Sequence, residues 1–356
     1  QQQAWDLQAT TIVAADRLDE QIEQLQTRLS RGPDDAGKLW VLALLHDAAG
    51  NAEQSLLLMP RVIKLVGSKS PLLRRYAQAL ADAGQSQQAI AAYRSLLELP
   101  AEAELADYQR LIDLQLRQGD ETDAAQTAAE CVANRPWDPE AYQLQAQVAS
   151  ADGRAEDKLA ALRQAVRVAP RDASAQRHFI QALVDTEQTA AALRQFGSLL
   201  DAAPNLNDKI AALAWTLSWA TDDQQRQYLL KEIQQRRLSE PLADDDWTRT
   251  LAFLLEQIGQ PRQALLELRE LHSRTPLNVD LLRKIVELAE VTRQLDAAVQ
   301  YQKRIVHLDS SAQPLEKLAR LYRQAGRPSE AIRIWEQLLQ LPTSTADALG
   351  LIDKLI

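Results

Sequence analysis

The sequence predicts an all-α fold, an extended array of helix–turn–helix units, from three observations. Good helix formers (Ala, Leu, Gln, Arg and Glu) dominate the composition, and the residues typical of sheets are scarce. A turn signal returns about every 34 residues, and a proline follows most copies about 17 residues later. A chain of 356 residues is long for one helical core, whereas a repeat array grows in one dimension.

The turn signal is a Gly or other turn residue, then four polar positions, then a small residue that opens an apolar helix. Its clearest copies begin at Gly84, Gly119, Gly259 and Gly326. Weaker copies begin at Asp16, Gly50, Gly153, Glu187 and Arg293, and a degenerate copy lies near Asp223. Each copy predicts the turn inside a pair of helices.

The prolines predict where the second helix of each pair ends, because proline removes a backbone donor and pushes the preceding residue out of the helical region. These prolines are Pro33, Pro100, Pro136, Pro170, Pro204, Pro241, Pro276 and Pro342. Pro261 and Pro328 instead fall in the first turn of a helix, where proline is tolerated.

Together these signals predict a single array over 1–356 with ten repeats. The repeats lie near 2–34, 35–69, 70–103, 104–137, 138–172, 173–206, 207–243, 244–278, 279–311 and 312–344. Residues 345–356 are predicted to form the first helix of a further repeat. The chain starts without Met inside an amphipathic pattern, so we expect it to be a segment of a longer protein.

Two copies depart from the pattern. The seventh carries an apolar run from Ile210 to Trp219, which predicts a helix buried on more than one side. Trp215 and Trp219 lie four residues apart and should share a face, either for packing or as a platform for a ligand. In the ninth copy Gln302 takes a position that is aromatic elsewhere, with Tyr301 beside it.

The unit resembles the tetratricopeptide repeat, whose period is 34 residues. The third copy carries the matching residues Leu73, Tyr76, Ala77, Leu80, Ala89 and Tyr93, and the tenth carries Leu318, Ala319, Tyr322, Ala331 and Trp335. The resemblance implies a right-handed α-α superhelix, a solenoid of about ten helix–turn–helix repeats. It also implies a binding scaffold and not an enzyme.

Residue patterns for catalysis, a metal or a cofactor are absent from the sequence, so we expect none of the three. No two of the four histidines lie three or four residues apart, although His272 and His307 are one repeat apart. The glycines are single and lie in turns, which excludes a phosphate-binding loop. Cys131 is the only cysteine and is predicted to be a buried structural thiol.

The resemblance implies a concave groove lined by the first helix of each pair. Its candidate binding residues are Arg74, Gln78, Asp82, Gln109, Asp113, Glu140, Gln143, Gln147, Arg177, Gln181, Asp185, Arg249, Glu256, Arg283, Glu287 and Glu290. Trp40 and Phe253 are the aromatic anchors expected there. The alternative is a solvated surface on which neighbouring copies pair Arg with Asp or Glu.

Charge and hydropathy restrict the partners. The chain has 40 Lys and Arg against 49 Asp and Glu, a net charge of −9, which disfavours nucleic acid. No apolar run is long enough to span a bilayer, so we expect no membrane insertion. An acidic, amide-rich groove suits a cationic or neutral polysaccharide, or a protein partner.

The leading hypothesis is a segment of a bacterial envelope protein that assists exopolysaccharide export. Long arrays of this kind resemble the periplasmic repeat regions of export proteins of the Pel, poly-N-acetylglucosamine and cellulose systems. That resemblance implies a periplasmic location, attached to an outer-membrane protein, with binding of the polymer or a modifying enzyme. The alternative is a cytoplasmic adaptor that recognises a peptide or a helix.

Overall fold

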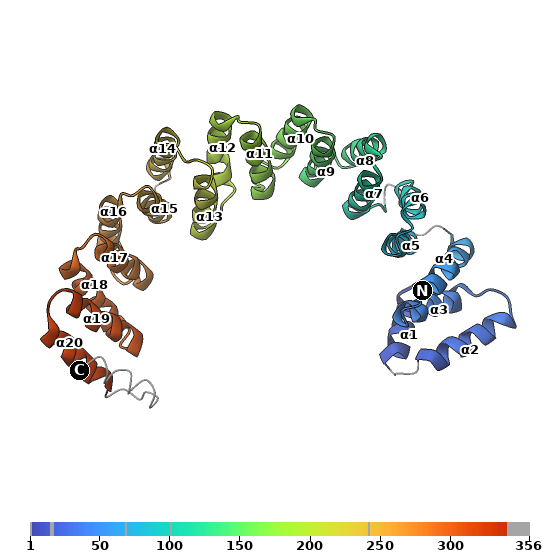
Figure 1. Ribbon diagram of the computed structural model, residues 1–356, viewed down its shortest axis with the longest axis horizontal. Coiled ribbons are helices and arrows are strands. Elements are labelled where there is room, and N and C mark those ends of the chain that lie inside the picture. Colours follow the sequence, from blue (N-terminus) through green and yellow to red (C-terminus); the bar gives the residue numbers. More distant parts are fainter. Residues whose placement is uncertain (1, 15–17, 68–69, 100–101, 241–242, 340–356) are drawn as a thin grey trace. The chain divides into compact units, whose positions relative to one another are not determined.

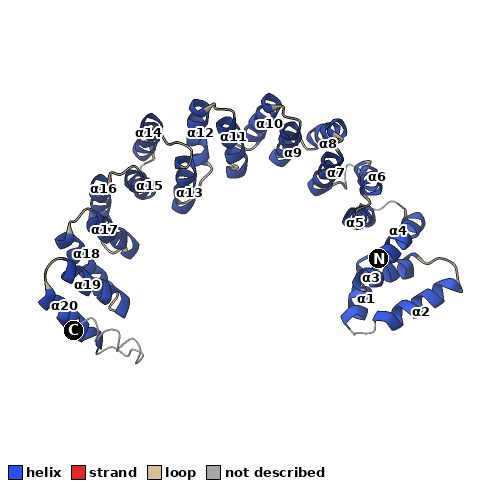
Figure 2. Ribbon diagram, viewed as in Figure 1, coloured by secondary structure: helices blue, strands red, loops and turns tan. Residues whose placement is uncertain are grey.

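The computed structural model describes residues 2–14, 18–67, 70–99, 102–240 and 243–339, and these residues form twenty helices and no strand (Figures 1 and 2). The predicted all-α class is therefore confirmed for the described residues. The chain divides into two compact units, Gln1–Thr186 and Glu187–Ile356. The predicted helix over 345–356 lies outside the described residues.

The first unit holds eleven of these helices. They are α1 (Gln2–Ala14), α2 (Leu18–Ser30), α3 (Ala36–Ala48), α4 (Ala52–Val66), α5 (Ser70–Asp82), α6 (Ser86–Leu97), α7 (Leu105–Gln118), α8 (Glu121–Asn134), α9 (Pro139–Ala151), α10 (Ala155–Val168) and α11 (Ala173–Asp185). From α3 to α10, each odd-numbered helix packs against the even-numbered helix that follows it.

The second unit holds the other nine described helices. They are α12 (Thr189–Asp201), α13 (Leu206–Leu217), α14 (Asp223–Ser239), α15 (Asp244–Gln257), α16 (Pro261–Arg274), α17 (Val279–Val291), α18 (Leu295–Leu308), α19 (Ala312–Gln324) and α20 (Pro328–Leu339). Each of the ten predicted repeat ranges contains two helices; that all ten form one array remains a prediction.

Most of the described turns inside the helix pairs contain one left-handed residue. At Gly84, Gly119 and Gly259 the backbone φ angles are 74°, 81° and 78°. Glu187 and Arg293 adopt the same conformation, with φ of 59° and 61°, although each carries a Cβ that makes it costly. The weaker copies at Glu187 and Arg293 therefore have the same backbone geometry as the clear ones.

The turn near Asp223 is built differently. α13 ends at Leu217, and Asp222 then caps α14. The Asp222 carboxylate accepts from the Gln225 backbone N at 2.7 Å, and the Gln225 side chain accepts from the Asp222 backbone N at 3.3 Å. This reciprocal cap satisfies two donors at the helix start without a left-handed residue. The turn predicted at Asp16 lies outside the described residues.

Prolines separate the pairs where the structure describes them. Pro33, Pro136, Pro170, Pro204 and Pro276 each lie between a second helix and the next first helix. Pro261 and Pro328 are the first residues of α16 and α20, as predicted. Pro100, Pro241 and Pro342 lie outside the described residues.

α3 is enclosed on several sides, because α1, α2 and α4 all pack against it. Its residues from Leu39 to His46 are all buried. Trp40 is among them, and its indole Nε1 donates to Asp6 Oδ1 of α1 at 2.8 Å. The prediction that Trp40 is an anchor in the groove is therefore wrong, because the N-terminal pair covers it.

The seventh pair differs from its prediction in part. The buried residues of α13 are Lys209, Ala212, Leu213 and Thr216, whose spacing places them on one face, and Ala211 and Ala214 are exposed. Full burial is therefore confined to one face, and the predicted burial on more than one side is not found. Its exposed apolar residues are small alanines, which leave little surface to bury. The Trp215 and Trp219 rings meet edge to face, 6.1 Å between centroids, as their spacing predicts. Their role as a ligand platform stays a prediction.

The ninth pair replaces an aromatic residue by a buried amide. Gln302 is buried, and its Nε2 donates to the backbone carbonyl oxygen of Pro314 in α19 at 2.8 Å. The side chain thus links α18 to the next pair by a hydrogen bond instead of by ring packing. A buried amide without such a partner would carry a large desolvation cost.

Buried His272 lies next to a cation. Its Nε2 is 2.6 Å from Arg304 Nη1, and its ring meets Tyr301 edge on, 5.5 Å between centroids. Because a guanidinium only donates, Nε2 accepts and the imidazole is neutral. Burial, and then the charge of Arg304, lower the pKa of His272.

Acid should therefore destabilise the second unit. The unfolded chain binds a proton at His272 near the ordinary pKa of 6.5, whereas the folded chain resists protonation. The unfolded state then holds more protons, so stability falls as the pH drops below about 6.5. His272→Gln keeps an acceptor for Arg304 and does not titrate, so its melting temperature should fall less between about pH 7 and pH 5.

The control is His307→Gln, since His307 is exposed and its variant should follow the wild type. An unchanged acid response of His272→Gln in melts followed by circular dichroism would contradict the assignment.

The left-handed turns generate a second expectation. Arg293→Gly should raise the free energy of unfolding by about 0.5–1 kcal/mol, because glycine adopts positive φ without steric cost. Gly259→Ala should lower it by about 1 kcal/mol at the equivalent turn. Thermal melting of the two variants measures both; a destabilised Arg293→Gly would show that the side chain is needed there.

Candidate functional site

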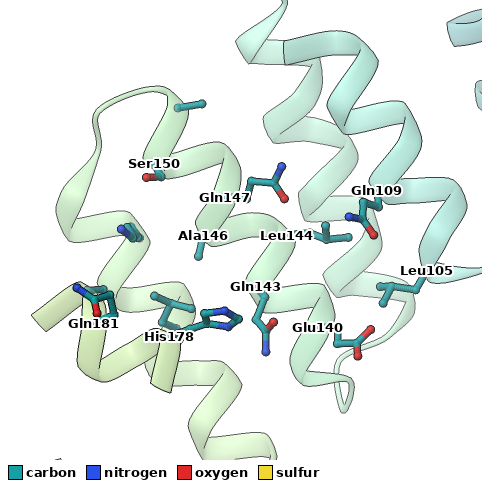
Figure 3. Close-up of a pocket in the computed structure, with 14 residues that line it drawn as sticks. Leu105, Gln109, Glu140, Gln143, Leu144, Ala146, Gln147, Ser150, His178 and Gln181 are labelled. Carbon is teal, nitrogen blue, oxygen red and sulfur yellow. The ribbon is translucent and has the colours of Figure 1, made fainter. Parts of the chain in front are cut away.

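A pocket of about 670 Å³ opens between α7, α9, α10 and α11 in the first unit (Figure 3). Residues of three repeats share it, and most are polar amides or apolar side chains. The lining residues are Leu105, Gln109, Glu140, Gln143, Leu144, Ala146, Gln147, Ser150, Ala151, Lys158, Leu162, His178, Gln181 and Ala182.

Five of the predicted groove residues line this pocket: Gln109, Glu140, Gln143, Gln147 and Gln181. They lie on first helices, at positions that recur from one repeat to the next. Stacked repeats place equivalent positions side by side, which is why sequence spacing brings these residues to one surface. Their use in binding stays a prediction.

Two of the four glutamines of the pocket are oriented by carboxylates. Gln147 Nε2 of α9 donates to Asp113 Oδ1 of α7 at 3.0 Å, and Gln181 Nε2 donates to Asp185 Oδ1 within α11 at 2.8 Å. An amide that uses its N–H₂ in this way has its carbonyl oxygen left for a ligand. The wall of the pocket is therefore rich in hydrogen-bond acceptors.

Other pocket residues were missed by the sequence reasoning. His178 extends from α11 towards Gln143 of α9 (Figure 3). Lys158 of the second helix α10 also lines the pocket. Lys158 Nζ lies 3.5 Å from Asp185 Oδ2, so its charge is already paired. The resemblance assigns only selected positions of each first helix to the groove, and His178 does not occupy one of them. Nothing in the repeat pattern indicates that a lysine of a second helix reaches the groove.

The pocket also has apolar surface and one buried amide. Leu144 and Leu162 contribute buried aliphatic side chains, and Leu105 a half-buried one. Gln143 Nε2 is shut off from solvent and has no hydrogen-bond partner among the described residues. A buried donor without a partner carries a desolvation cost.

Gln78, Asp82 and Asp113 line a smaller hollow of about 80 Å³ between α5 and α7. Gln78 Nε2 donates to Asp82 Oδ1 at 2.8 Å, and its carbonyl oxygen accepts from the Tyr93 hydroxyl at 3.3 Å. Both ends of this amide are therefore used within the protein.

Arg74 is engaged in a contact between repeats. Its Nε and Nη2 donate to the two oxygens of Asp107 at 2.7 and 2.8 Å, and its Nη1 lies 2.9 Å from Glu104 Oε1. Asp107 is buried at the start of α7 and also accepts from the Glu104 backbone N. The hydrogen bond to Asp107 raises the pKa of Arg74, so the residue links α5 to α7 as a permanent cation.

Most predicted groove residues of the second unit are also paired. Lys284 bridges Glu256 at 2.8 Å and Glu287 at 3.5 Å, and Lys317 lies 3.2 Å from Glu290. This pairing corresponds to the solvated-surface alternative, although with Lys in place of Arg. Such exposed pairs contribute little to stability.

The remaining predicted residues have individual surroundings. Arg283 Nη1 lies 3.4 Å from Asp280 within α17, and Arg177 is exposed on α11. Arg249 is half-buried on α15, and its Nε has no partner among the described residues. Phe253, the second expected anchor, is half-buried on the same helix.

Among the described residues, the one thiol is buried and the possible metal ligands do not cluster. Burial raises the pKa of Cys131 to about 11, so it stays a protonated thiol at neutral pH and its predicted burial is confirmed. Within the described residues, no three His, Cys, Asp or Glu side chains gather as metal ligands would. No described helix is both long and apolar enough to cross a bilayer.

Solved structures with a similar fold include MamA (residues 41 to the end) from Desulfovibrio magneticus RS-1, at 20% identity and a TM-score of 0.37, over 48% of this chain and 97% of that one. The Naa15/Naa10 complex bound to HypK-THB matches 99% of this chain and 70% of that one, at 13% identity and a TM-score of 0.36. The P58(IPK) TPR domain matches 95% of this chain and 99% of that one, at 15% identity and a TM-score of 0.27.

No protein-family model matches the chain, and no curated protein matches it in sequence. Similarities to solved structures at this level do not identify a function.

Removing the buried carboxylate at the α5–α7 contact should destabilise the first unit. Asp107→Ala leaves Arg74 without its main partner and should cost about 3–5 kcal/mol in the free energy of unfolding. Asp113→Ala, which removes only an exposed hydrogen bond, should cost about 1 kcal/mol or less.

Urea unfolding measures both, and the double variant Arg74→Met with Asp107→Leu should recover much of the loss, since no unpaired charge remains. Equal midpoints for Asp107→Ala and Asp113→Ala would show that the buried pair is not a structural link.

Proposed function

We propose that this chain is a non-catalytic binding scaffold whose ligand contacts the pocket between α7, α9, α10 and α11. One observation carries the proposal: Gln147 and Gln181 use their N–H₂ groups on Asp113 and Asp185, which leaves the carbonyl oxygens of these two pocket residues for a ligand. Such a surface recognises a ligand that supplies donors. It has no nucleophile–base pair of the kind that catalysis requires.

The chemistry of the wall favours a ligand with amine, hydroxyl or N–H groups. Glu140 adds a carboxylate to the acceptors, and the acidic balance of the chain attracts cations. Ser150 supplies a hydroxyl that can either donate or accept. Amino sugars and peptides both supply the matching groups.

Within this class we propose a role in exopolysaccharide export, in the bacterial periplasm and attached to an outer-membrane protein. The support is the resemblance of the repeat array to export proteins and the fit of a cationic or neutral polymer to an acceptor-rich pocket. A partner enzyme that modifies the polymer is a second ligand consistent with the same scaffold.

A cytoplasmic adaptor that recognises a peptide or helix is the alternative. Leu105, Leu144 and Leu162 favour it, because apolar side chains below polar amides suit a peptide with alternating apolar residues. The two roles share the pocket and differ in the ligand.

The test measures, by calorimetry at increasing salt concentrations, the binding of deacetylated glucosamine oligomers to the full chain. Binding should weaken as salt rises and should fall at least tenfold in the double variant Asp113→Ala with Glu140→Gln. Asp113→Ala frees the Gln147 amide, and Glu140→Gln removes the carboxylate.

Glu287→Ala is the matched control, since Glu287 occupies an equivalent groove position in the second unit but pairs with Lys284. Loss of binding in the double variant but not in the control supports the pocket as the binding site. Equal loss in both would show that the ligand responds only to the net charge of the chain. Binding of a peptide in place of the oligomers would shift the assignment to the adaptor.

A further inference from the structure

The hollow between α5 and α7 adjoins the pocket. Asp113 lines the hollow, and its Oδ1 accepts from Nε2 of Gln147, a residue of the pocket, at 3.0 Å. Gln109 of the pocket and Asp113 of the hollow are four residues apart on α7, so they are neighbours on one face of that helix. A ligand that leaves the pocket across α7 therefore enters the hollow.

The hollow supplies acceptors and donors side by side. Asp82 and Asp113 each use one carboxylate oxygen on a glutamine amide, at 2.8 and 3.0 Å, and the other oxygen of each has no partner among the described residues. Arg110 and Arg117 of α7 line the same hollow, and neither is ion-paired within the described part of the chain. Two carboxylates and two guanidiniums give the hollow no net charge, yet each group can form hydrogen bonds with a ligand.

The hydroxyl groups of a sugar match this chemistry, because a hydroxyl both donates and accepts. With a volume of about 80 Å³, the hollow has room for the polar substituents of a ring but not for a whole ring. Its aliphatic lining is limited to Ala81 and Leu114, so an apolar side chain of a peptide would find little matching surface. The hollow therefore favours a sugar over a peptide.

We propose that the hollow is a second subsite for the polymer held in the pocket, and that it takes hydroxyl groups of a sugar residue further along the same polymer. This inference rests on the proposed function and gives its ligand a minimum length. Asp113 serves both cavities, because one of its oxygens orients Gln147 and the other is left for the hollow.

The spacing of the helices separates the two subsites. Packed helices lie about 8–10 Å apart. The pocket and the hollow together extend over the first helices α5, α7, α9 and α11, which is three such steps. A disaccharide is too short to cover three steps, whereas a hexasaccharide is long enough. The length of the oligomer therefore distinguishes binding in the pocket alone from binding in both cavities.

The experiment compares glucosamine dimers with hexamers, by calorimetry at one salt concentration, on the full chain and on the double variant Asp82→Asn with Arg117→Gln. Both side chains are exposed, and asparagine keeps an acceptor for Gln78, so the fold should be retained. The wild type should bind the hexamer at least about tenfold more tightly than the dimer, because the second contact is intramolecular. The variant should lose most of this gain and keep its affinity for the dimer.

The matched control is Glu121→Gln with Arg167→Gln. It removes one carboxylate and one guanidinium, as the test variant does, at exposed positions of α8 and α10 that line neither cavity. The control should bind dimer and hexamer as the wild type does. Melting followed by circular dichroism checks that both double variants are folded.

A hexamer gain that survives in Asp82→Asn with Arg117→Gln, or that is lost equally in the control, overturns the second subsite. If dimer binding still depends on Asp113 and Glu140 in that case, the pocket and the scaffold proposal stand. Failure of the wild type to bind either oligomer overturns the polysaccharide assignment, and the subsite with it. If hexaserine, and not the hexamer, loses affinity in the Asp82 and Arg117 variant, the hollow takes a peptide and the sugar assignment is wrong.

Discussion

Each helix pair leaves apolar side chains on its flanks, and only the next pair can bury them. Tyr108 of α7 shows the constraint: it is fully buried in a cluster that includes Cys131 of its own pair and Ala141 and Leu144 of the next. Burial of such surface is the main favourable term in folding. The stacking of pairs therefore fixes which faces are covered and which remain open.

Polar contacts between repeats follow from the same stacking. Trp40 bonds to Asp6 and Gln147 bonds to Asp113, each 34 residues away, and Arg74 reaches Asp107 over 33. Residues one repeat period apart in the sequence are therefore in contact in the structure. Some of these contacts hold the pairs together and others shape the pocket, and the difference lies in how deeply each partner is buried.

The fold was largely predictable because its signals are local and periodic. The turn residues at Glu187 and Arg293 were recognised without glycine, since the frame around them recurs. The site was predictable only in part. Spacing placed Gln109, Gln143 and Gln147 on one surface, but it could not show that Arg74 is bound to a buried carboxylate or that α1 covers Trp40. Those outcomes depend on side-chain partners in other helices.

The bond between Gln147 and Asp113 has a consequence for recognition. A glutamine amide has nearly the same shape in either orientation, and turning it by half a rotation exchanges its donor for its acceptor. Asp113 selects one orientation by accepting a hydrogen bond from the amide N–H₂, which is worth about 1 kcal/mol at this exposed position. Whether Gln147 offers the ligand a donor or an acceptor is therefore determined by Asp113, which belongs to the neighbouring repeat and does not line the pocket.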